Sequence, residues 1–564
     1  MSNPLFHLAS FTSNQIPESD GSLRGCRVNI AKSDNHLSVM EDSTDIQNFY
    51  TNYGFYQGYA VNQQEQEMNK QQQEMNVYAA HSADQLSQGE VKLNSLETGS
   101  NVGEVPFLSL APFELLRNNP SKHKNTEGDK ARDVNGGANV HQKLSAMHIM
   151  RLAGERFIQF SSNKFININN LLHPYGSALS YLSTEDNQDV ELAQILLAAA
   201  EKVSEQQYDR ARKFLSQCQL LASKAGNTVQ REVFYFAQAL GERIDRETGI
   251  LTPKISAETN ELNSICTAPR LHASHVALHQ EVPFTQVVHF TGIQAILESV
   301  ATKSKVHLID FHIRTGVQWA SLIQAAAERK DNPIEHMNIT VIESVNKQRV
   351  EKTGKSLESF ATSLNFPFSF KIVFLPDRNQ LTKDHFYIET DEGVVIHAAF
   401  FLRAMICEPN CLETAMRVVK QLQPSLMVVS EVEANLNSPV FVNRFIDSLF
   451  YYSALFDCLE DVMKRDDQHR MTIEESYGGG ILNIVGSEGE ERVIRSVNLD
   501  VWRSFLGRFG MEEVKLSDTC LYQANLIIQQ FDCRDSCSAD MNGGSLAVSW
   551  KGTPIYSTSA WKFH

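Results

Sequence analysis

Apolar side chains recur at every third or fourth position along the middle of the chain, which is the spacing of one face of an α-helix. Three consecutive stretches show this spacing: Leu192, Ile195, Leu196, Ala199 and Val203; Tyr208, Ala211, Leu215, Cys218 and Ala222; and Val233, Phe236, Ala237, Leu240 and Ile244. Because such faces must be covered, we expect these three helices to pack on one another. Helical spacing also runs over residues 146–160, and over residues 284–300 after Pro283.

At Val306 the pattern changes to short apolar runs, of the kind that a parallel strand buried on both faces needs. The predicted strands are residues 306–311, 338–343, 368–375, 393–398 and 426–432, and crossover helices fit residues 317–329, 348–364, 411–422 and 440–459. Near the C-terminus, residues 545–550 and 554–559 flank Lys551-Gly552-Thr553 and predict a hairpin. We therefore predict an α/β fold with a Rossmann-like sheet, similar to the sheet of class I methyltransferases.

Residues 1–140 are rich in Asn, Gln, Ser, Glu and Gly and have no sustained apolar period, so we predict a disordered, low-complexity N-terminal tail there. An aromatic cluster interrupts the tail: Phe49, Tyr50, Tyr53, Phe55, Tyr56 and Tyr59. It is either a docking segment that orders on a partner or an accident of composition. Residues 141–188 are predicted to be a helical lead-in to the folded part.

The charge and the cysteines narrow the classes of function. A formal net charge of −16 over 564 residues argues against general attraction to DNA phosphates, which depends on clustered Lys and Arg. Nine cysteines are scattered along the chain, which fits a reducing compartment better than a disulfide-rich secreted domain. The first 22 residues lack the pattern of a secretory signal, and the most apolar stretch, residues 394–406, is too short to cross a bilayer. We expect a soluble, intracellular protein.

The loop after the first predicted strand is where such a fold would hold S-adenosylmethionine or a nucleotide, with glycines that let the backbone approach the ligand. Here it reads Phe311-His312-Ile313-Arg314-Thr315-Gly316, with a single glycine, and we predict no cofactor. Glu343 ends the second strand, where an acid often binds ribose hydroxyls in nucleotide folds, but an acid at a strand end is more often a cap or a solvated side chain.

Two further polar residues lie on the first predicted strand. We interpret Asp310 as a carboxylate that accepts hydrogen bonds from the following turn, and His307 as a core histidine with satisfied nitrogens. Neither has an evident nucleophile beside it in the sequence, and we predict no catalytic residues.

The cysteine pairs Cys407/Cys411 and Cys533/Cys537 are each spaced CxxxC, outside any Cys/His finger pattern, and we predict no metal site. The run Gly478-Gly479-Gly480 lacks the ending of a phosphate-binding loop, and we interpret it as a flexible turn.

Several motifs in order resemble those of the GRAS family of plant transcriptional regulators. One stretch resembles the VHIID motif of this family: Val306, His307, Leu308, Ile309 and Asp310, followed by Gly316, Gln318 and Trp319. A second stretch, near the C-terminus, resembles the SAW motif: Trp550, Gly552, Ser559, Ala560 and Trp561. Residues 432–441 and 451–459 resemble the segment after the PFYRE region, and the helices of residues 192–244 match the first leucine-rich region. The resemblance covers residues 189–564, and implies a mainly helical cap in 189–300 and an α/β core in 301–564.

The chain also departs from the family pattern. Gly479-Gly480 stand where Arg-Glu often precedes a strand, expected here at residues 481–485. The RVER-like stretch is Arg492-Val493-Ile494-Arg495, with Ile in the acidic place, and Ala320 replaces a common Pro. These changes put in doubt the ion pairs of the family, but not its sheet or cap. The body resembles the DELLA-like branch, but the tail has no DELLA or VHYNP string, so we expect no gibberellin-dependent destruction.

The resemblance implies a non-enzymatic, nuclear regulator of transcription that acts as a scaffold or co-regulator of DNA-binding transcription factors. It also implies pairing with other GRAS proteins, indirect contact with DNA and no contact with membranes. The cap helices are the expected partner surface, through Leu192, Ile195, Leu196 and Leu215. Two alternatives remain: an S-adenosylmethionine-dependent methyltransferase, and a protein that binds specific DNA sequences directly.

Overall fold

The computed structural model describes residues 144–162, 182–250, 269–463 and 467–564. Its centre is a nine-stranded sheet in the order β3-β2-β1-β4-β5-β9-β8-β7, with β6 also paired to β9. Five parallel strands form one half: β1 (Lys305–Asp310), β2 (His336–Glu343), β3 (Phe368–Phe374), β4 (Gly393–Ala399) and β5 (Leu426–Val432). All five correspond to predicted strands. The α/β fold with a methyltransferase-like strand order is therefore confirmed.

The other half of the sheet is antiparallel and is organised by the long strand β9 (Thr553–Phe563). One edge of β9 pairs with β5, while its other edge pairs first with β8 (Ser545–Trp550) and then with β6 (Met511–Val514). β7 (Cys537–Asn542) completes this side by pairing with β8. The predicted hairpin is thus confirmed, and its second strand runs four residues beyond Ser559, to Phe563.

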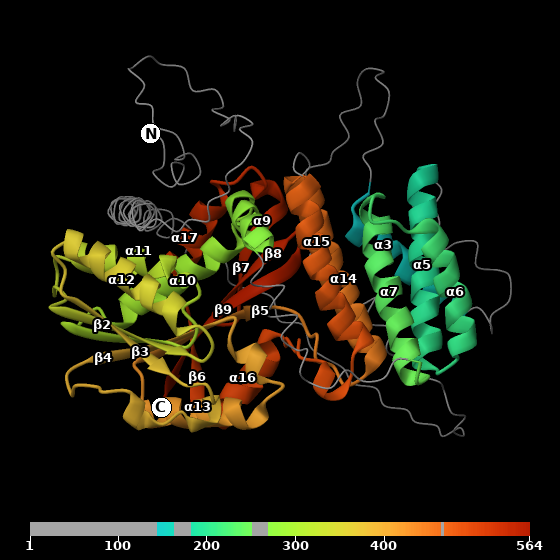
Figure 1. Cartoon of the computed structure of the whole chain (residues 1–564). Coiled ribbons are helices and arrows are strands. Elements are labelled where there is room, and N and C mark those ends of the chain that lie inside the picture. Colours follow the sequence, from blue (N-terminus) through green and yellow to red (C-terminus); the bar gives the residue numbers. More distant parts are fainter. Residues whose placement is uncertain (1–143, 163–181, 251–268, 464–466) are drawn as a thin grey trace, which may run out of the picture.

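Helices cover both faces of the sheet (Figure 1). One face carries α10 (Phe284–Ser299), α11 (Val317–Glu328), α12 (Lys347–Ser363) and α17 (Asp518–Ile528), and the other carries α13 (Pro409–Leu422) and α16 (Leu499–Arg508). Alternate residues of a strand point to opposite faces, and β5 shows the result. Leu426 and Val428 belong to the core under α10, whereas Met427 and Val429 belong to the core over α13.

A helical cap stands beside the sheet (Figure 1). It consists of α3 (Ala146–Ser162), α5 (Thr184–Ser204), α6 (Tyr208–Leu221) and α7 (Thr228–Glu247), packed against α14 (Phe441–Val462) and α15 (Asp467–Ile481). The remaining helix, α9 (Pro269–Glu281), lies against α15. The apolar residues of the cap and of one sheet face form one continuous cluster, so the cap and the sheet share a core. Helix α10, expected in the cap region, packs instead on β5, β8 and β9.

The prediction of a flexible turn at the three glycines and a strand at residues 481–485 is wrong. Gly478, Gly479 and Gly480 lie inside α15, which continues into a π-helical turn over Leu482–Gly486. A Cβ added to Gly478 would lie 2.2 Å from the ring of Tyr235, and one on Gly480 would lie 2.4 Å from the hydroxyl of Tyr452. The glycines therefore allow α15 to approach α7 and α14 closely, which no local pattern reveals.

Two other features bear on the predicted organisation. None of the helices among the described residues is long and apolar enough to span a membrane. The predicted tail and its aromatic cluster lie outside the described residues. Within the predicted lead-in, α3 is helical as expected, and Asp457 of α14 accepts hydrogen bonds from the backbone N–H groups of Ala146 and Met147 at its start.

Candidate functional site at the carboxyl edge of the sheet

Asp310, the last residue of β1, is the centre of a buried hydrogen-bond network. The parallel register places it opposite His397 of β4, and His397 Nδ1 lies 3.2 Å from Asp310 Oδ1. The same oxygen accepts from the backbone N–H of His312 at 3.0 Å, and Oδ2 accepts from Trp319 Nε1 at 2.7 Å. The ring of Trp319 also packs edge-on against His397, with centroids 4.7 Å apart. Both carboxylate oxygens are thus occupied, which confirms the predicted role of Asp310 in shaping the turn.

The crevice of this fold, where a cofactor would bind, lies at the carboxyl ends of β1 and β4. The loop from β1 to α11 occupies this crevice with its own side chains. His312 stacks on Phe401 at 5.8 Å, and burial, followed by the charge of Arg314, lowers the pKa of His312 to about 4. The loop ends at Gly316, whose φ of +72° is in the left-handed region that favours glycine. A Cβ there would lie 2.6 Å from Thr353 Cγ2. Gly316 therefore serves the close packing of α11 on α12.

Glu343, at the carboxyl end of β2, shapes a turn in the same way. Its Oε1 accepts from the backbone N–H groups of Ser344, Val345 and Asn346, at 2.8, 2.7 and 3.2 Å. Its Oε2 faces Arg349, 3.4 Å away. Burial opposes ionisation, but these donors outweigh it and lower the pKa of Glu343. The carboxylate caps the turn into α12, so the oxygens that a ribose would need already have partners.

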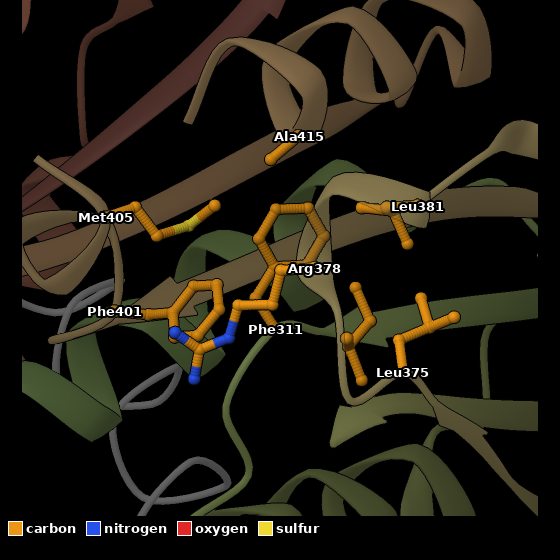
Figure 2. A pocket seen from close by; sticks show the side chains of 8 residues that line it. Phe311, Leu375, Arg378, Leu381, Phe401, Met405 and Ala415 are labelled. Atoms are coloured by element: carbon orange, nitrogen blue, oxygen red, sulfur yellow. The ribbon is translucent and has the colours of Figure 1, made fainter. Parts of the chain in front are cut away.

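One hollow beside the first strand is small. Figure 2 shows the ring of Phe311 between Phe401 and Met405 on one side and Leu381 on the other, with Arg378 next to Phe401. The cavity among these side chains has a volume of about 10 Å³. That is about the space of one water molecule, whereas pockets for cofactor-sized ligands measure about 300–1,000 Å³.

The crevice rim contains residues that the sequence did not single out. Phe400 has a φ of +55°, and its ring lies 5.6 Å from the guanidinium carbons of Arg314 and Arg403. Glu431, at the end of β5, accepts from the backbone N–H of Arg403 at 3.2 Å, and burial raises the pKa of Glu431 to about 7. The sequence does not mark either residue. Phe rarely adopts a positive φ, so nothing in the sequence predicts one at Phe400, and Glu431 resembles any other polar residue in a strand.

His307 is a core histidine, as predicted. Its Nε2 accepts from the hydroxyl of Thr340 at 2.8 Å and from the amide of Asn338 at 3.1 Å, while Nδ1 lies 3.2 Å from Glu392. Burial is the main cause that lowers the pKa of His307. The remaining VHIID-like residues, namely Val306, Leu308, Ile309, Gln318 and Trp319, are buried, so this motif forms the core around β1.

The SAW-like residues are also structural. Trp550 and Trp561 are buried in different cores, on opposite faces of the sheet. Ser559 and Ala560 lie opposite Val429 and Val428 of β5, and Ser559 Oγ accepts from Trp561 Nε1 at 2.8 Å. Gly552, with a φ of +83°, makes the hairpin turn between β8 and β9.

The arginines near the RVER-like stretch form ion pairs, although Ile494 stands in the acidic place. Their partner is an acid outside that stretch. Glu488 accepts from Arg243 of the cap at 2.7 Å and pairs with Arg444 of α14. Arg492 Nε lies 3.7 Å from the same carboxylate, and Arg492 NH1 donates to Asn437 at 3.0 Å. The network joins the cap to the body, so Ile494 in the acidic place leaves the arginines with partners. In the part of the chain that the structure describes, no group of three or more His, Cys, Asp or Glu side chains is arranged to hold a metal ion.

Three of the four cap residues expected to contact a partner are not at the surface. Leu192, Leu196 and Leu215 are buried and Ile195 is half-buried, because their stripes pack between α5, α6 and α7. The three buried leucines cannot meet a partner unless the cap opens. The exposed apolar residues of α6 are instead Leu220 and Leu221, which are 85% and 53% exposed.

A groove lies between α6 and α7, and neither Leu220 nor Leu221 lines it. It has a volume of about 380 Å³ and is lined by residues of α6 and α7: Gln219, Ala222, Phe234, Ala237, Gln238, Gly241, Glu242 and Asp245. Its walls combine apolar and polar side chains, and Asp245 is paired with Arg212 at 2.6 Å. The helical hydrophobic pattern identified α6 and α7, but not which leucines face outward.

Comparisons with known proteins agree with the fold. The chain matches the model of the GRAS domain family over residues 192–562. The DELLA protein RGL3 of Arabidopsis thaliana is 32% identical over 408 residues, which are 71% of this chain and 76% of that protein. The DELLA protein GAIP of Cucurbita maxima is 32% identical over 383 residues, 67% of this chain and 64% of its own. The structure of SCL7 from Oryza sativa matches with a TM-score of 0.58 at 28% identity, over 66% of this chain and 99% of SCL7. The chain therefore belongs to the GRAS domain family of plant regulators, with a body similar to that of DELLA proteins.

Proposed function

We propose that this protein acts in the nucleus as a scaffold or co-regulator of DNA-binding transcription factors, in plant development, hormone signalling or root symbiosis. The observation that carries the proposal is a contrast between two places. The carboxyl edge of the sheet is filled by the protein's own side chains, whereas the cap presents an open groove between α6 and α7 and, on α6, two exposed leucines that do not line it. Its partners are transcription factors and other GRAS proteins, and contact with DNA is indirect.

The α6–α7 groove is the surface that we assign to these partners. An amphipathic helix laid along a groove places its apolar residues every three to four positions, and Phe234 and Ala237 offer apolar contact within this groove. Leu220 and Leu221 extend the apolar surface of α6 outside the groove. The sequence-based expectation of a partner surface on the cap is thus kept, but it is moved from Leu192, Ile195, Leu196 and Leu215 to the outward-facing residues.

The methyltransferase alternative is favoured by the strand order and by the position of Glu343. Against it stand the hydrogen bonds that already occupy Glu343, and the side chains of His312 and Phe311 in the crevice. Direct DNA recognition has less support, because the net charge is −16 and phosphate contacts require clustered basic residues.

One set of measurements with the full chain separates the three functions. Titration calorimetry with S-adenosylmethionine tests the enzyme, and promoter DNA titrated with and without a co-purified plant transcription factor tests the other two. The scaffold predicts no heat with S-adenosylmethionine and DNA retention only with the transcription factor. Micromolar cofactor binding supports the enzyme, while tight DNA binding by the protein alone, weakened steeply by salt, supports direct recognition.

A further inference from the structure

The two CxxxC pairs look alike in the sequence, but the structure separates them. The Sγ atoms of Cys533 and Cys537 lie 3.7 Å apart across a 3₁₀ turn, Arg534–Ser536. In the other pair, Cys407 Sγ donates to the carbonyl of Ala404 and Cys411 Sγ donates to Glu408, each at 3.1 Å. Only the first pair therefore has its two sulfurs facing each other, among the free cysteines that the structure describes.

The turn between Cys533 and Cys537 is held at both ends. The backbone N–H of Ser536 donates to the carbonyl of Cys533 at 2.9 Å, and the N–H of Lys551 donates to the carbonyl of Ser536 at 2.7 Å. Cys537 is the first residue of β7 and pairs with Trp550 of β8. To reach the S–S bond length the sulfurs must approach by ~1.7 Å, a change that side-chain rotation and a small shift of this surface turn supply.

The two thiols differ in the way that an attacking and a resolving cysteine differ. The hydrogen bond from the Cys537 thiol lowers the pKa of Cys533, and the same bond, with burial, raises the pKa of Cys537. Both cysteines are only half-buried, so a small oxidant reaches them. A thiolate that is accessible and next to a second thiol is the arrangement found in redox-sensing cysteines.

We propose that Cys533 and Cys537 are a site of oxidative modification. Hydrogen peroxide converts the two thiols into an intramolecular disulfide, and thiol reductants restore the thiols. The Cys533 thiolate attacks one oxygen of hydrogen peroxide, the O–O bond breaks, and hydroxide leaves and takes up a proton to give water. Cys537 sulfur then attacks the sulfenic sulfur, its S–H proton leaves with the hydroxide as a second water, and the S–S bond forms. Two thiols and one peroxide give one disulfide and two waters.

Oxidation also changes a contact with the helices beside the sheet. In the thiol form, Cys533 Sγ donates to the carbonyl of Glu281, the last residue of α9, at 3.4 Å. A disulfide has no S–H, so this carbonyl loses its donor. Cys458 of α14 lies nearby, but it is 2% exposed and burial raises its pKa well above the usual value, which makes it a poor competitor.

The test uses the full chain, reduced, desalted and titrated with hydrogen peroxide. Remaining thiols are alkylated after denaturation, and tryptic peptides are read by mass spectrometry. Trypsin cuts after Arg534, so Cys533 and Cys537 fall on peptides 516–534 and 535–551, which only a disulfide can join. We expect this linked pair, with Cys520 alkylated, at peroxide levels that leave Cys407 and Cys411 alkylated. We also expect dithiothreitol to remove the link.

Two variants complete the test. The double variant Cys407→Ser/Cys411→Ser keeps the other CxxxC pair and should form the linked peptides as the wild type does. Cys537→Ser should lose the link and accumulate oxidised Cys533 instead. The wild type gives the decisive result, because it needs no substitution that could disturb folding. The inference is overturned if its linked peptides do not appear at a lower peroxide concentration than oxidation of Cys407. It is equally overturned if Cys533 is found joined to Cys458 or Cys520.

Discussion

The carboxyl edge of the sheet and the outer face of the cap are both places where a protein of this fold can bind something, yet they are built in opposite ways. At the sheet edge, the oxygens of Asp310 and Glu343 accept hydrogen bonds from the protein's own N–H groups, and the hollow beside Phe311 has a volume of about 10 Å³. On the cap, α6 and α7 leave a groove of about 380 Å³, and Leu220 of α6 is 85% exposed.

The difference teaches where a change in sequence should affect folding and where it should affect binding. A buried network whose members satisfy one another contributes to stability, and removing one member leaves others unpaired in a low dielectric. An exposed leucine contributes little to stability, because water already contacts most of its surface in the folded state. Substitutions at the two places should therefore have opposite effects on folding and on partner capture.

The largest expected effect is that of Trp319→Ala. The substitution removes a buried indole of α11 that contacts Asp310 of β1 and His397 of β4, and it leaves the Oδ2 atom of Asp310 without its donor. We expect a loss of about 3–5 kcal/mol in the free energy of unfolding, the usual range for an aromatic residue cut to Ala in a core. Urea unfolding followed by far-UV circular dichroism measures it without relying on tryptophan fluorescence.

Trp319→Phe is the matched control, because it retains an aromatic ring but lacks the indole N–H. We expect an intermediate loss, about 1–3 kcal/mol, which reports the unpaired Asp310 oxygen. If Trp319→Ala kept the wild-type unfolding curve but lost a single activity, the carboxyl edge would be a binding site and the comparison of the two regions would fail.

A smaller loss is expected for Gly316→Ala, which alters the loop that fills the crevice. Its positive φ costs an L-residue about 1–2 kcal/mol, and the contact of 2.6 Å with Thr353 Cγ2 adds to that unless the threonine moves. Gly479→Ala is the control, since a Cβ there meets nothing within 4 Å inside α15. It should gain about 0.5–1 kcal/mol. Equal effects of both substitutions on the urea midpoint would contradict the role given to Gly316.

The elements were predictable where one local period dominates. The five parallel strands are short apolar runs, and α5, α6 and α7 follow the helical period, so their positions matched. The missed strands β6 and β7 are short and largely polar, and their strand form comes from pairing with β9 and β8. The glycines of α15 misled the prediction for a similar reason, because the rings that they contact, Tyr235 and Tyr452, lie far away in the sequence.

The site was predictable only in its local half. A carboxylate that ends a strand and bonds to the next turn is a short-range motif, so the bond from His312 to Asp310 followed from the sequence. The bond from His397 depends on the register between β1 and β4. Its two residues are 87 positions apart, and the sequence does not show which residues of the two strands lie opposite each other. The same limit applies to the cap, where the helical period marked the apolar stripe but could not show which leucines the packing of α5, α6 and α7 leaves outside.

The smallest effect on stability is expected at those outward leucines, and it gives the sharpest test of the comparison. Leu220→Ala/Leu221→Ala removes side chains that are 85% and 53% exposed, so the unfolding free energy should change by only about 0.5 kcal/mol per site. Leu215→Ala, on the same helix but 4% exposed, should lose about 2–5 kcal/mol.

Binding should rank these variants in the reverse order. If a partner on the α6–α7 face also contacts Leu220 and Leu221, the double variant should bind a purified transcription-factor partner about tenfold more weakly, a change of about 1.4 kcal/mol measured by calorimetry. Leu215→Ala, under conditions where it remains folded, should bind as the wild type does, because its side chain points into the cap. Wild-type affinity in the double variant would remove the α6–α7 face as the partner surface, and the regulator would then have to use another part of the chain.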